Sequence, residues 1–164
     1  MRHLIVIGFL CFAHTVKAQN SVSELLKLHN TESIPYITVE ALAQQDTEAI
    51  LLDARELKEY NTSHLESAIH VGYDFFDITK VTKTITDKSS KIIVYCSLGI
   101  RSEDIAEQLK KEGYTNVYNL FGGIFEWKNN DFAVYDTNNE PTEDVHAFSN
   151  EWSPWLLKGN KIYD

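Results

Sequence analysis

Short apolar runs alternate with amphipathic or polar stretches along most of this chain. The runs are rich in β-branched residues and are bounded by turn-forming residues, which favours buried strands. The predicted strands are Tyr36–Thr38, Ala49–Leu52, Ala68–Val71, Ile92–Tyr95 and Asn116–Leu120. The stretches between them predict helices over Val39–Gln45, Glu56–Tyr60, Asp74–Asp77, Ile78–Ile85, Ser102–Glu112 and Ile124–Lys128. Thr38 and Ser102 are suited to cap two of these helices, and Gly113 to end one.

Strands that alternate with helices predict an α/β fold. We expect a three-layer α/β/α arrangement with a central, mostly parallel five-stranded sheet. In such folds ligands bind at the carboxyl ends of the strands. The expected organisation is a targeting segment over 1–18, a helix and connector over 19–34, the α/β domain over 35–131 and an extension over 132–164.

The segments that flank the domain carry weaker patterns. Ser21–His29 has apolar residues at helical spacing and predicts a short amphipathic helix. Asp136–Pro141 is polar and is interpreted as a loop. Thr142–Asp164 carries aromatic residues, including Trp152 and Trp155, which favours an extension packed on the domain over a surface that binds a partner.

Composition limits the classes of partner. The chain has 164 residues, of which 43% are hydrophobic and 24% charged, enough apolar content for a core of ordinary size. Its formal net charge of -9 argues against nucleic acid as a partner.

The first 18 residues have the form of a secretory signal peptide. Arg2 precedes the apolar run Leu4–Ala13, and Val16 and Ala18 give a small-residue cleavage pattern before the next position. The run is too short to span a bilayer, so we expect no stable membrane anchor. The sequence therefore predicts export to a periplasm or to the medium.

Cleavage would leave a single cysteine, Cys96, because Cys11 lies in the leader. An exported protein with one cysteine forms no internal disulfide. Cys96 follows a predicted strand and precedes a predicted helix, with Arg101 nearby. A helix N-terminus and an arginine both stabilise a thiolate, and backbone N–H groups of such a loop can bind an anion. The candidate catalytic residues are Cys96 and Arg101, and the candidate substrate-binding residues are Ser97, Leu98, Gly99, Ile100 and Ser102.

Other polar residues are given structural roles. Asp53 and Arg55 follow a strand end, and we expect a supporting salt bridge or loop cap in preference to direct contact with substrate. His64 and His70 are interpreted as packed or surface residues, and no cluster has metal-ligand spacing, so neither a metal nor a cofactor is expected. Asn61 begins an Asn-Thr-Ser pattern for N-glycosylation, which matters only in a eukaryotic secretory pathway.

Three motifs in the chain resemble those of the single-domain rhodanese-like sulfurtransferases, over about residues 35 to 130. The motifs are Leu51–Arg55 with His64–Ile69, Cys96–Ser102, and Gly113–Tyr114 with Val117–Leu120, Gly122–Ile124 and Trp127. Many members of the family have a basic residue after the cysteine, where this chain has Ser97. Members also commonly have glycine, proline and glycine at the positions of Ser63, Glu66 and Ser67.

The resemblance implies sulfur transfer. Cys96 would attack the outer sulfur of a small donor such as thiosulfate or a persulfide, and the persulfide so formed would pass its sulfur to cyanide, a small thiol or a protein thiol. Two alternatives remain open. One is a non-catalytic rhodanese-like binding module; the other, less favoured because only four residues separate Cys96 from Arg101, is a cysteine phosphatase.

Overall fold

The computed structural model describes residues 22–44 and 49–164. Within that part of the chain a five-stranded sheet has the order β1-β5-β4-β2-β3, and every neighbouring pair is parallel. Its strands are β1 (Tyr36–Ile37), β2 (Ile50–Asp53), β3 (Ile69–His70), β4 (Ile92–Tyr95) and β5 (Val117–Leu120). The predicted α/β class with a five-stranded parallel sheet is confirmed.

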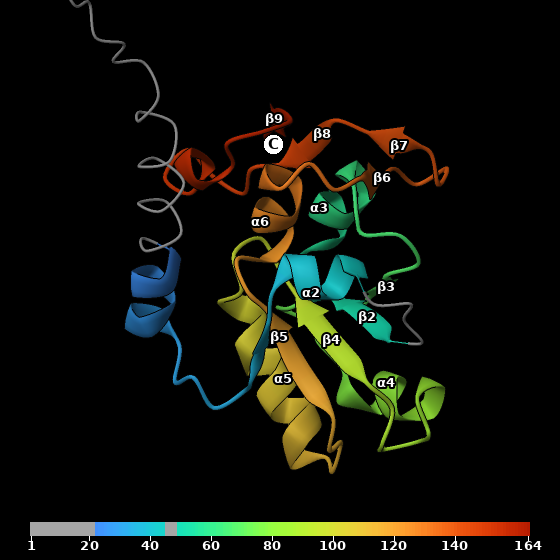
Figure 1. The fold of residues 1–164 in the computed structure, drawn as a ribbon. Coiled ribbons are helices and arrows are strands. Elements are labelled where there is room, and N and C mark those ends of the chain that lie inside the picture. Colours follow the sequence, from blue (N-terminus) through green and yellow to red (C-terminus); the bar gives the residue numbers. More distant parts are fainter. Residues whose placement is uncertain (1–21, 45–48) are drawn as a thin grey trace, which may run out of the picture.

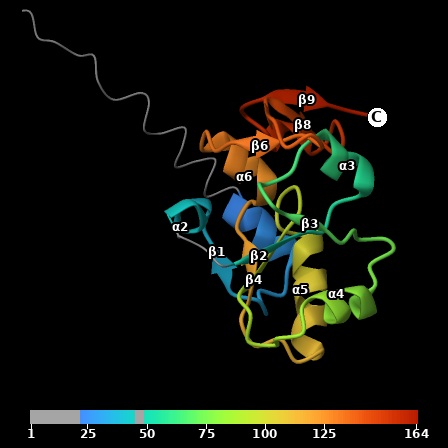
Figure 2. The same cartoon turned by 90° about the vertical axis from the view of Figure 1, so that its right-hand side faces the viewer.

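Helices cover both faces of the sheet (Figures 1 and 2). They are α2 (Val39–Gln44), α3 (Leu57–Thr62), α4 (Ile78–Thr84), α5 (Arg101–Lys111) and α6 (Gly123–Asn129), and residues 22–29 are also helical. Side chains of α2 and α6 contribute to one hydrophobic cluster, and those of α4 and α5 to a second. The sheet therefore separates two cores. No helix among the described residues is long and apolar enough to cross a bilayer.

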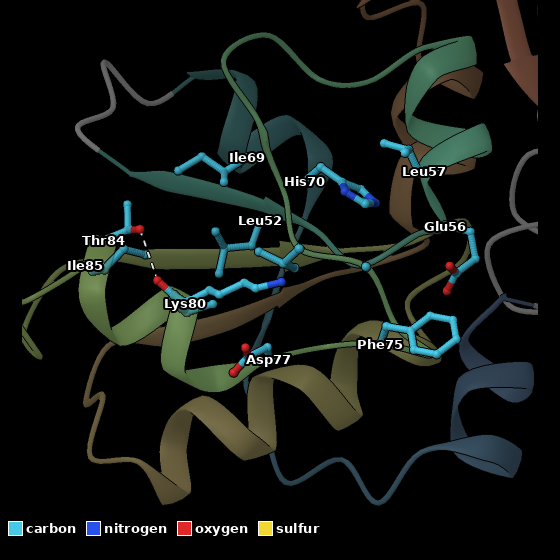
Figure 3. A pocket seen from close by; sticks show the side chains of 13 residues that line it. Leu52, Glu56, Leu57, Ile69, His70, Phe75, Asp77, Lys80, Thr84 and Ile85 are labelled. Atoms are coloured by element: carbon cyan, nitrogen blue, oxygen red, sulfur yellow. Dashed lines mark hydrogen bonds between the residues drawn. The ribbon is translucent and has the colours of Figure 1, made fainter.

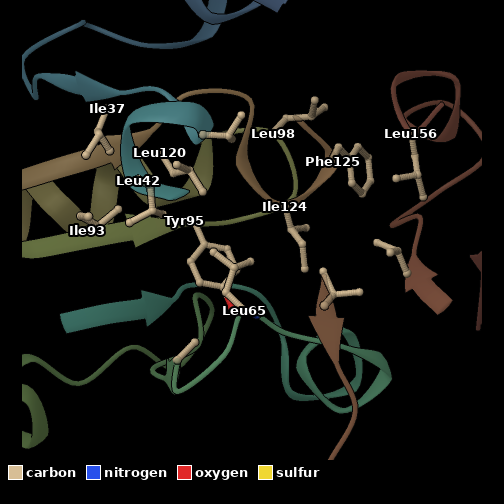
Figure 4. Close-up of a cluster of buried hydrophobic side chains, with 14 of the residues drawn as sticks. Ile37, Leu42, Leu65, Ile93, Tyr95, Leu98, Leu120, Ile124, Phe125 and Leu156 are labelled. Carbon is tan, nitrogen blue, oxygen red and sulfur yellow. Dashed lines mark hydrogen bonds between the residues drawn. The ribbon is translucent and has the colours of Figure 1, made fainter. Parts of the chain in front are cut away.

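The central strand β4 supplies both cores. Ile93 and Tyr95 lie in the cluster with α2 and α6 (Figure 4). Ile92 and Val94 lie in the cluster with α4 and α5. All four side chains are fully buried. A strand covered on both faces needs apolar residues at consecutive positions, which explains the unbroken apolar run in the sequence.

The C-terminal segment forms two small strand pairs. β6 (Val134–Tyr135) pairs with β7 (Pro141–Thr142), and β8 (Asp144–His146) pairs with β9 (Asn160–Ile162). A short 3-10 turn over Ser153–Trp155 lies between β8 and β9. Val145, Ala147 and Leu156 are fully buried in the cluster that contains α6, so this segment packs on the α/β core.

Several expected local features are corrected by the structure. Ser102 is not the cap of its helix: Ile100 occupies that position, and Ser102 is a buried residue of the first turn. Residues 74–77 are not helical. Asp77 caps α4, since its carboxylate accepts a 2.9 Å hydrogen bond from the Thr79 N–H, and the helix begins at Ile78. The helix α3 also continues past its predicted end, to Thr62.

Two other local expectations are confirmed by the structure. The Thr38 hydroxyl accepts a 3.2 Å hydrogen bond from the Ala41 N–H in the first turn of α2. Gly113 follows α5 with a φ of 98°, a left-handed value that favours glycine. The expected signal peptide over 1–18, including Cys11, lies outside the described residues, as do Ser21 and Gln45 at the ends of two predicted helices.

Candidate active site

Cys96 stands at the carboxyl end of β4, where the chain turns through a short loop into α5. Its side chain is buried, and the Gly99 N–H donates a 3.1 Å hydrogen bond to the Cys96 Sγ. Gly99 has a φ of 101°, a backbone conformation that glycine adopts without steric cost. The loop thus bends back over the sulfur and directs a backbone donor at it.

A buried amide holds this loop in place. Asn119, at the end of β5, donates a 2.8 Å hydrogen bond from Nδ2 to the Gly99 carbonyl and accepts one of 2.8 Å from the Ser102 hydroxyl. The Ser102 Oγ is also 3.5 Å from the Cys96 Sγ. Asn30 adds a second donor to the Gly99 carbonyl, at 2.9 Å. Neither asparagine was singled out from the sequence.

Arg101 is bound to a carboxylate. Its two terminal nitrogens each donate a 2.8 Å hydrogen bond to Glu59, one to each oxygen, and Nη2 also donates to the Ser97 Oγ at 3.0 Å. The Ser97 hydroxyl in turn donates to Glu59 Oε1 at 3.0 Å. Burial would raise the pKa of the Glu59 carboxyl, but the hydrogen bonds and charge of Arg101 outweigh it and lower that pKa. Because the two charges offset each other, Arg101 contributes little net positive charge to the site.

Glu59 belongs to α3 and is set by the cap of that helix. Its Oε2 accepts a 2.9 Å hydrogen bond from the Glu56 N–H, while the Glu56 side chain bonds the backbone at position 59, which makes a capping box. The Glu56-x-x-Glu59 spacing was the available signal in the sequence. This spacing identifies a helix start. It does not reveal that the Glu59 carboxylate binds Arg101, which is distant in the sequence.

Asp53 and Arg55 form a buried ion pair. Both side chains are fully buried, and Arg55 Nη2 is 2.6 Å from Asp53 Oδ2. The same nitrogen donates to the Ser63 carbonyl at 2.6 Å, and the Arg55 N–H donates to Asp53 Oδ1 at 2.9 Å. The pair ties the end of β2 to the segment after α3. Neither residue lines the cavity next to Cys96, so their role here is to support the loops around it.

The N-terminus of α6 is pressed against the cysteine loop. The Ile124 N–H donates to the Cys96 carbonyl at 2.9 Å, and the Phe125 N–H donates to the Ser97 carbonyl at 3.1 Å. Gly123 has a φ of 57°, and a Cβ there would lie 2.2 Å from the Cys96 carbonyl oxygen. Only glycine fits so close to another backbone, which accounts for the glycine at position 123.

A cavity of about 170 Å³ opens beside the sulfur. It is lined by Cys96, Ser97, Leu98, Ile100, Arg101, Phe148 and Trp152. The predicted loop residues thus lie together. Gly99 and Ser102 contact the Cys96 sulfur and do not line the cavity. Phe148 and Trp152 come from the C-terminal segment and were not predicted as site residues. The Phe148 ring centre is 4.7 Å from the Arg101 guanidinium carbon.

A larger cavity of about 430 Å³ lies elsewhere (Figure 3). Its walls come mainly from β3, α4 and the segment between them, and none of its lining residues is a cysteine. His70 lines it and places Nε2 2.9 Å from the Arg55 carbonyl oxygen.

His64 stacks on Tyr60 at a ring separation of 4.1 Å. Among the residues that the structure describes, no group of three or more histidine, cysteine or acidic residues could hold a metal ion.

Comparison with known proteins agrees with this geometry. The model of the family described as "Rhodanese-like domain" matches residues 38–130, more than half of the chain. The chain belongs to the rhodanese-like domain family.

Curated relatives of this rhodanese-like domain are longer proteins. It is 38% identical over 88 residues to a tRNA uridine(34) hydroxylase of Aster yellows witches'-broom phytoplasma, which covers 52% of this chain and 29% of that protein. It is 32% identical over 101 residues to YrkF, a candidate sulfur carrier protein of Bacillus subtilis, which covers 60% of this chain and 53% of that protein. The chain thus spans about a third of the length of that hydroxylase and about half of the length of YrkF.

Solved structures support the same fold. Protein hp1203 of Helicobacter pylori has a TM-score of 0.52 and 27% identity, covering 64% of this chain and 93% of that one. A thiosulfate sulfurtransferase of Pseudomonas aeruginosa has a TM-score of 0.59 and 21% identity, covering 86% of this chain and 26% of that one. At that identity the second likeness concerns the fold alone.

Proposed function

We propose that this rhodanese-like domain is a sulfurtransferase that carries sulfur on Cys96. The observation that carries the proposal is the sulfur itself, which is directed into a small cavity with the Gly99 N–H 3.1 Å from it. A thiolate at this position can act as a nucleophile, and a backbone N–H can stabilise the negative charge of a persulfide there. The names of relatives and neighbours that refer to sulfur transfer or carriage are in keeping with this chemistry.

The proposed cycle has two substitutions at sulfur. The Cys96 thiolate attacks the outer sulfur of the donor, a new S–S bond forms, and the donor remnant leaves with the electron pair of the broken bond. A thiolate or cyanide then attacks the terminal sulfur of the Cys96 persulfide, and Cys96 leaves as a thiolate. No oxidant or reductant is consumed. Small thiols, cyanide and exposed cysteines of partner proteins are all acceptors of the required kind.

The arrangement of Arg101 disfavours phosphatase chemistry. A phosphatase would need its guanidinium free to bind the oxygens of a phosphate. Here both terminal nitrogens are bound to Glu59, and a dianion would approach that carboxylate as well. The retention of Cys96 within a shaped cavity favours an enzyme over a binding module that has lost its chemistry.

Mass spectrometry of the protein after incubation with a sulfur donor tests the proposal. We expect the intact mass to rise by one sulfur atom and to return to its starting value after cyanide or a thiol reductant is added. Cys96→Ser should abolish both the added sulfur and the transfer to cyanide, because the described chain holds no other cysteine. Transfer by the serine variant at a rate near that of the wild type would rule out Cys96 as the sulfur carrier.

We further propose that the protein works outside the cytoplasm. The support is the sequence of residues 1–18, with its positive start, apolar run and small-residue cleavage pattern. A lone thiol in an oxidising compartment is exposed to oxidation unless it is used and restored. A cycle in which Cys96 alternates between thiolate and persulfide provides such a use.

A further inference from the structure

The C-terminal segment builds an aromatic wall beside the nucleophile. Phe148 and Trp152 face the cavity together with Leu98 and Ile100 from the cysteine loop. Four of the seven lining residues are therefore large and apolar. The cavity volume of about 170 Å³ suits one small organic group. Engineered cavities of about 150 Å³ with aliphatic and aromatic walls bind benzene.

The backbone of Phe148 is held in an unfavourable conformation to place this ring. Its φ is 65°, in the left-handed region, where a bulky residue is an outlier. The Phe148 N–H is bound to His146 Nδ1 at 3.1 Å, and His146 Nε2 is 3.0 Å from Asp164 Oδ1. Strained residues of this kind persist where the surrounding structure fixes them, and they gather at functional sites.

The charges around the cavity do not favour a small dianion. Arg101 is the only basic residue among those that line it, and Glu59 occupies both of its terminal nitrogens. Cys96 must itself be a thiolate to react. A doubly charged donor would thus meet one negative group and one neutralised pair. An apolar substituent on the donor, in contrast, would be removed from water against Phe148 and Trp152.

We propose that Phe148 and Trp152 select a sulfur donor that carries an apolar organic group, in preference to inorganic thiosulfate. The inference rests on the sulfurtransferase function proposed above and names its class of substrate. In a donor of the type R–SO₂–S⁻, the Cys96 thiolate attacks the terminal sulfur and forms the persulfide. The bond between that sulfur and the sulfonyl sulfur breaks, and the sulfinate R–SO₂⁻ leaves with the electron pair.

The test compares benzenethiosulfonate, methanethiosulfonate and thiosulfate, with cyanide as acceptor and thiocyanate as the measured product. The first two donors share one charge and one reacting bond but differ in apolar size. Their intrinsic reactivities are the same for every variant of the protein. A change in the ratio of their kcat/KM values between variants therefore reports on the cavity wall.

We expect the wild type to use benzenethiosulfonate with the highest kcat/KM of the three donors. Phe148→Ala and Trp152→Ala should each lower the ratio of kcat/KM for benzenethiosulfonate to that for methanethiosulfonate by about ten-fold, the effect of losing part of an apolar contact. Phe148→Leu should restore part of it. Leu157→Ala is the matched control, since Leu157 is an exposed apolar residue of the same segment outside the cavity.

Phe148→Gly provides a second variant if the alanine variant does not fold, because glycine accepts the positive φ without strain. The inference is overturned if thiosulfate is the best donor, or if the ratio is the same in the wild type and in the Phe148 and Trp152 variants. Both results would leave the sulfurtransferase function standing. Absence of Cys96-dependent transfer from all three donors would instead remove the proposed function, and this inference with it.

Discussion

Arg101 and Glu59 join two parts of the chain through two parallel hydrogen bonds of 2.8 Å, one to each carboxylate oxygen. The Glu59 side chain is 1% exposed and the Arg101 side chain 15% exposed. Paired geometry of this kind is among the stronger polar contacts in proteins. It holds the helix α3 against the loop that carries Cys96, so stability and the shape of the site depend on the same pair.

Glu59→Gln should destabilise the fold. Removal of one charge from a buried pair leaves the other uncompensated, and we expect a loss of about 2 kcal/mol in the free energy of unfolding at pH 7, because glutamine retains some hydrogen bonding. Urea denaturation measures this loss. Glu112→Gln is the control, since Glu112 forms only a longer, exposed contact of 3.8 Å with Lys88 and should change stability little.

The cost of Glu59→Gln should also depend on pH. The pKa of Glu59 in the folded protein is lowered from its ordinary value of 4.5, so the charged pair stabilises the fold fully above that value. As the pH falls below 4.5 through the lower native pKa, the carboxylate is protonated and the stabilisation is lost. The difference between wild type and variant should therefore shrink in acid. A constant difference from pH 7 to pH 3 would contradict this account.

Arg101→Ala should slow the reaction of Cys96 by more than the loss of a single distant positive charge would. It leaves the Glu59 carboxylate unpaired near a thiolate and an anionic donor. We expect a fall of about ten-fold in the rate of iodoacetamide alkylation at pH 7 and a higher KM for the donor, in line with about 1.4 kcal/mol. Arg101→Lys should recover part of both effects, since lysine keeps the charge without the planar fork.

The double variant Arg101→Ala/Glu59→Gln distinguishes an effect of the unpaired Glu59 charge from an effect of a changed loop shape. If the unpaired Glu59 carboxylate causes the defect, the double variant should alkylate faster than Arg101→Ala alone. Unchanged alkylation and donor saturation in Arg101→Ala would make Arg101 a structural residue of the loop.

Gly123→Ala should destabilise the fold more than Gly113→Ala. Both positions have a positive φ, but a Cβ at Gly123 would lie 2.2 Å from the Cys96 carbonyl oxygen, whereas nothing lies within 4 Å of one at Gly113. We expect a loss of about 1 kcal/mol from backbone strain at Gly113 and of about 3 kcal/mol at Gly123. Thermal unfolding of the two variants measures the difference, and equal losses would contradict the close approach.

Export should remove residues 1–18. We expect N-terminal sequencing of the protein from its native host to begin at Gln19, because the small residues Val16 and Ala18 fit the positions that a signal peptidase reads. Fractionation of the cells should place the processed form outside the cytoplasm. A cytoplasmic protein that begins at Met1 would end this proposal.

The sheet and the position of the Cys96 loop could be predicted from the amino-acid pattern alone. The strand β4 is buried on both faces, and a strand so placed must be apolar at consecutive positions, which a pattern reveals. Cys96 and Arg101 are five positions apart at a strand end, so their proximity follows from local chain geometry. The capping error at Ser102 arose because its hydroxyl bonds Asn119, a residue from another strand, and not its own helix.

The groups that surround the Cys96 sulfur come from distant parts of the chain and could not be predicted from local patterns. Glu59 is 42 positions before Arg101, and Phe148 is 47 positions after it, so no local pattern connects them to the loop. A glutamate in an amphipathic helix and a phenylalanine in an irregular tail each have many compatible environments. Their places are fixed by how α3 and the C-terminal segment pack on the core, a result of the summed burial of distant side chains. The conformation of the loop that carries Cys96 is thus local, whereas the charge and shape of the cavity beside it are set by contacts that form only when the chain is folded.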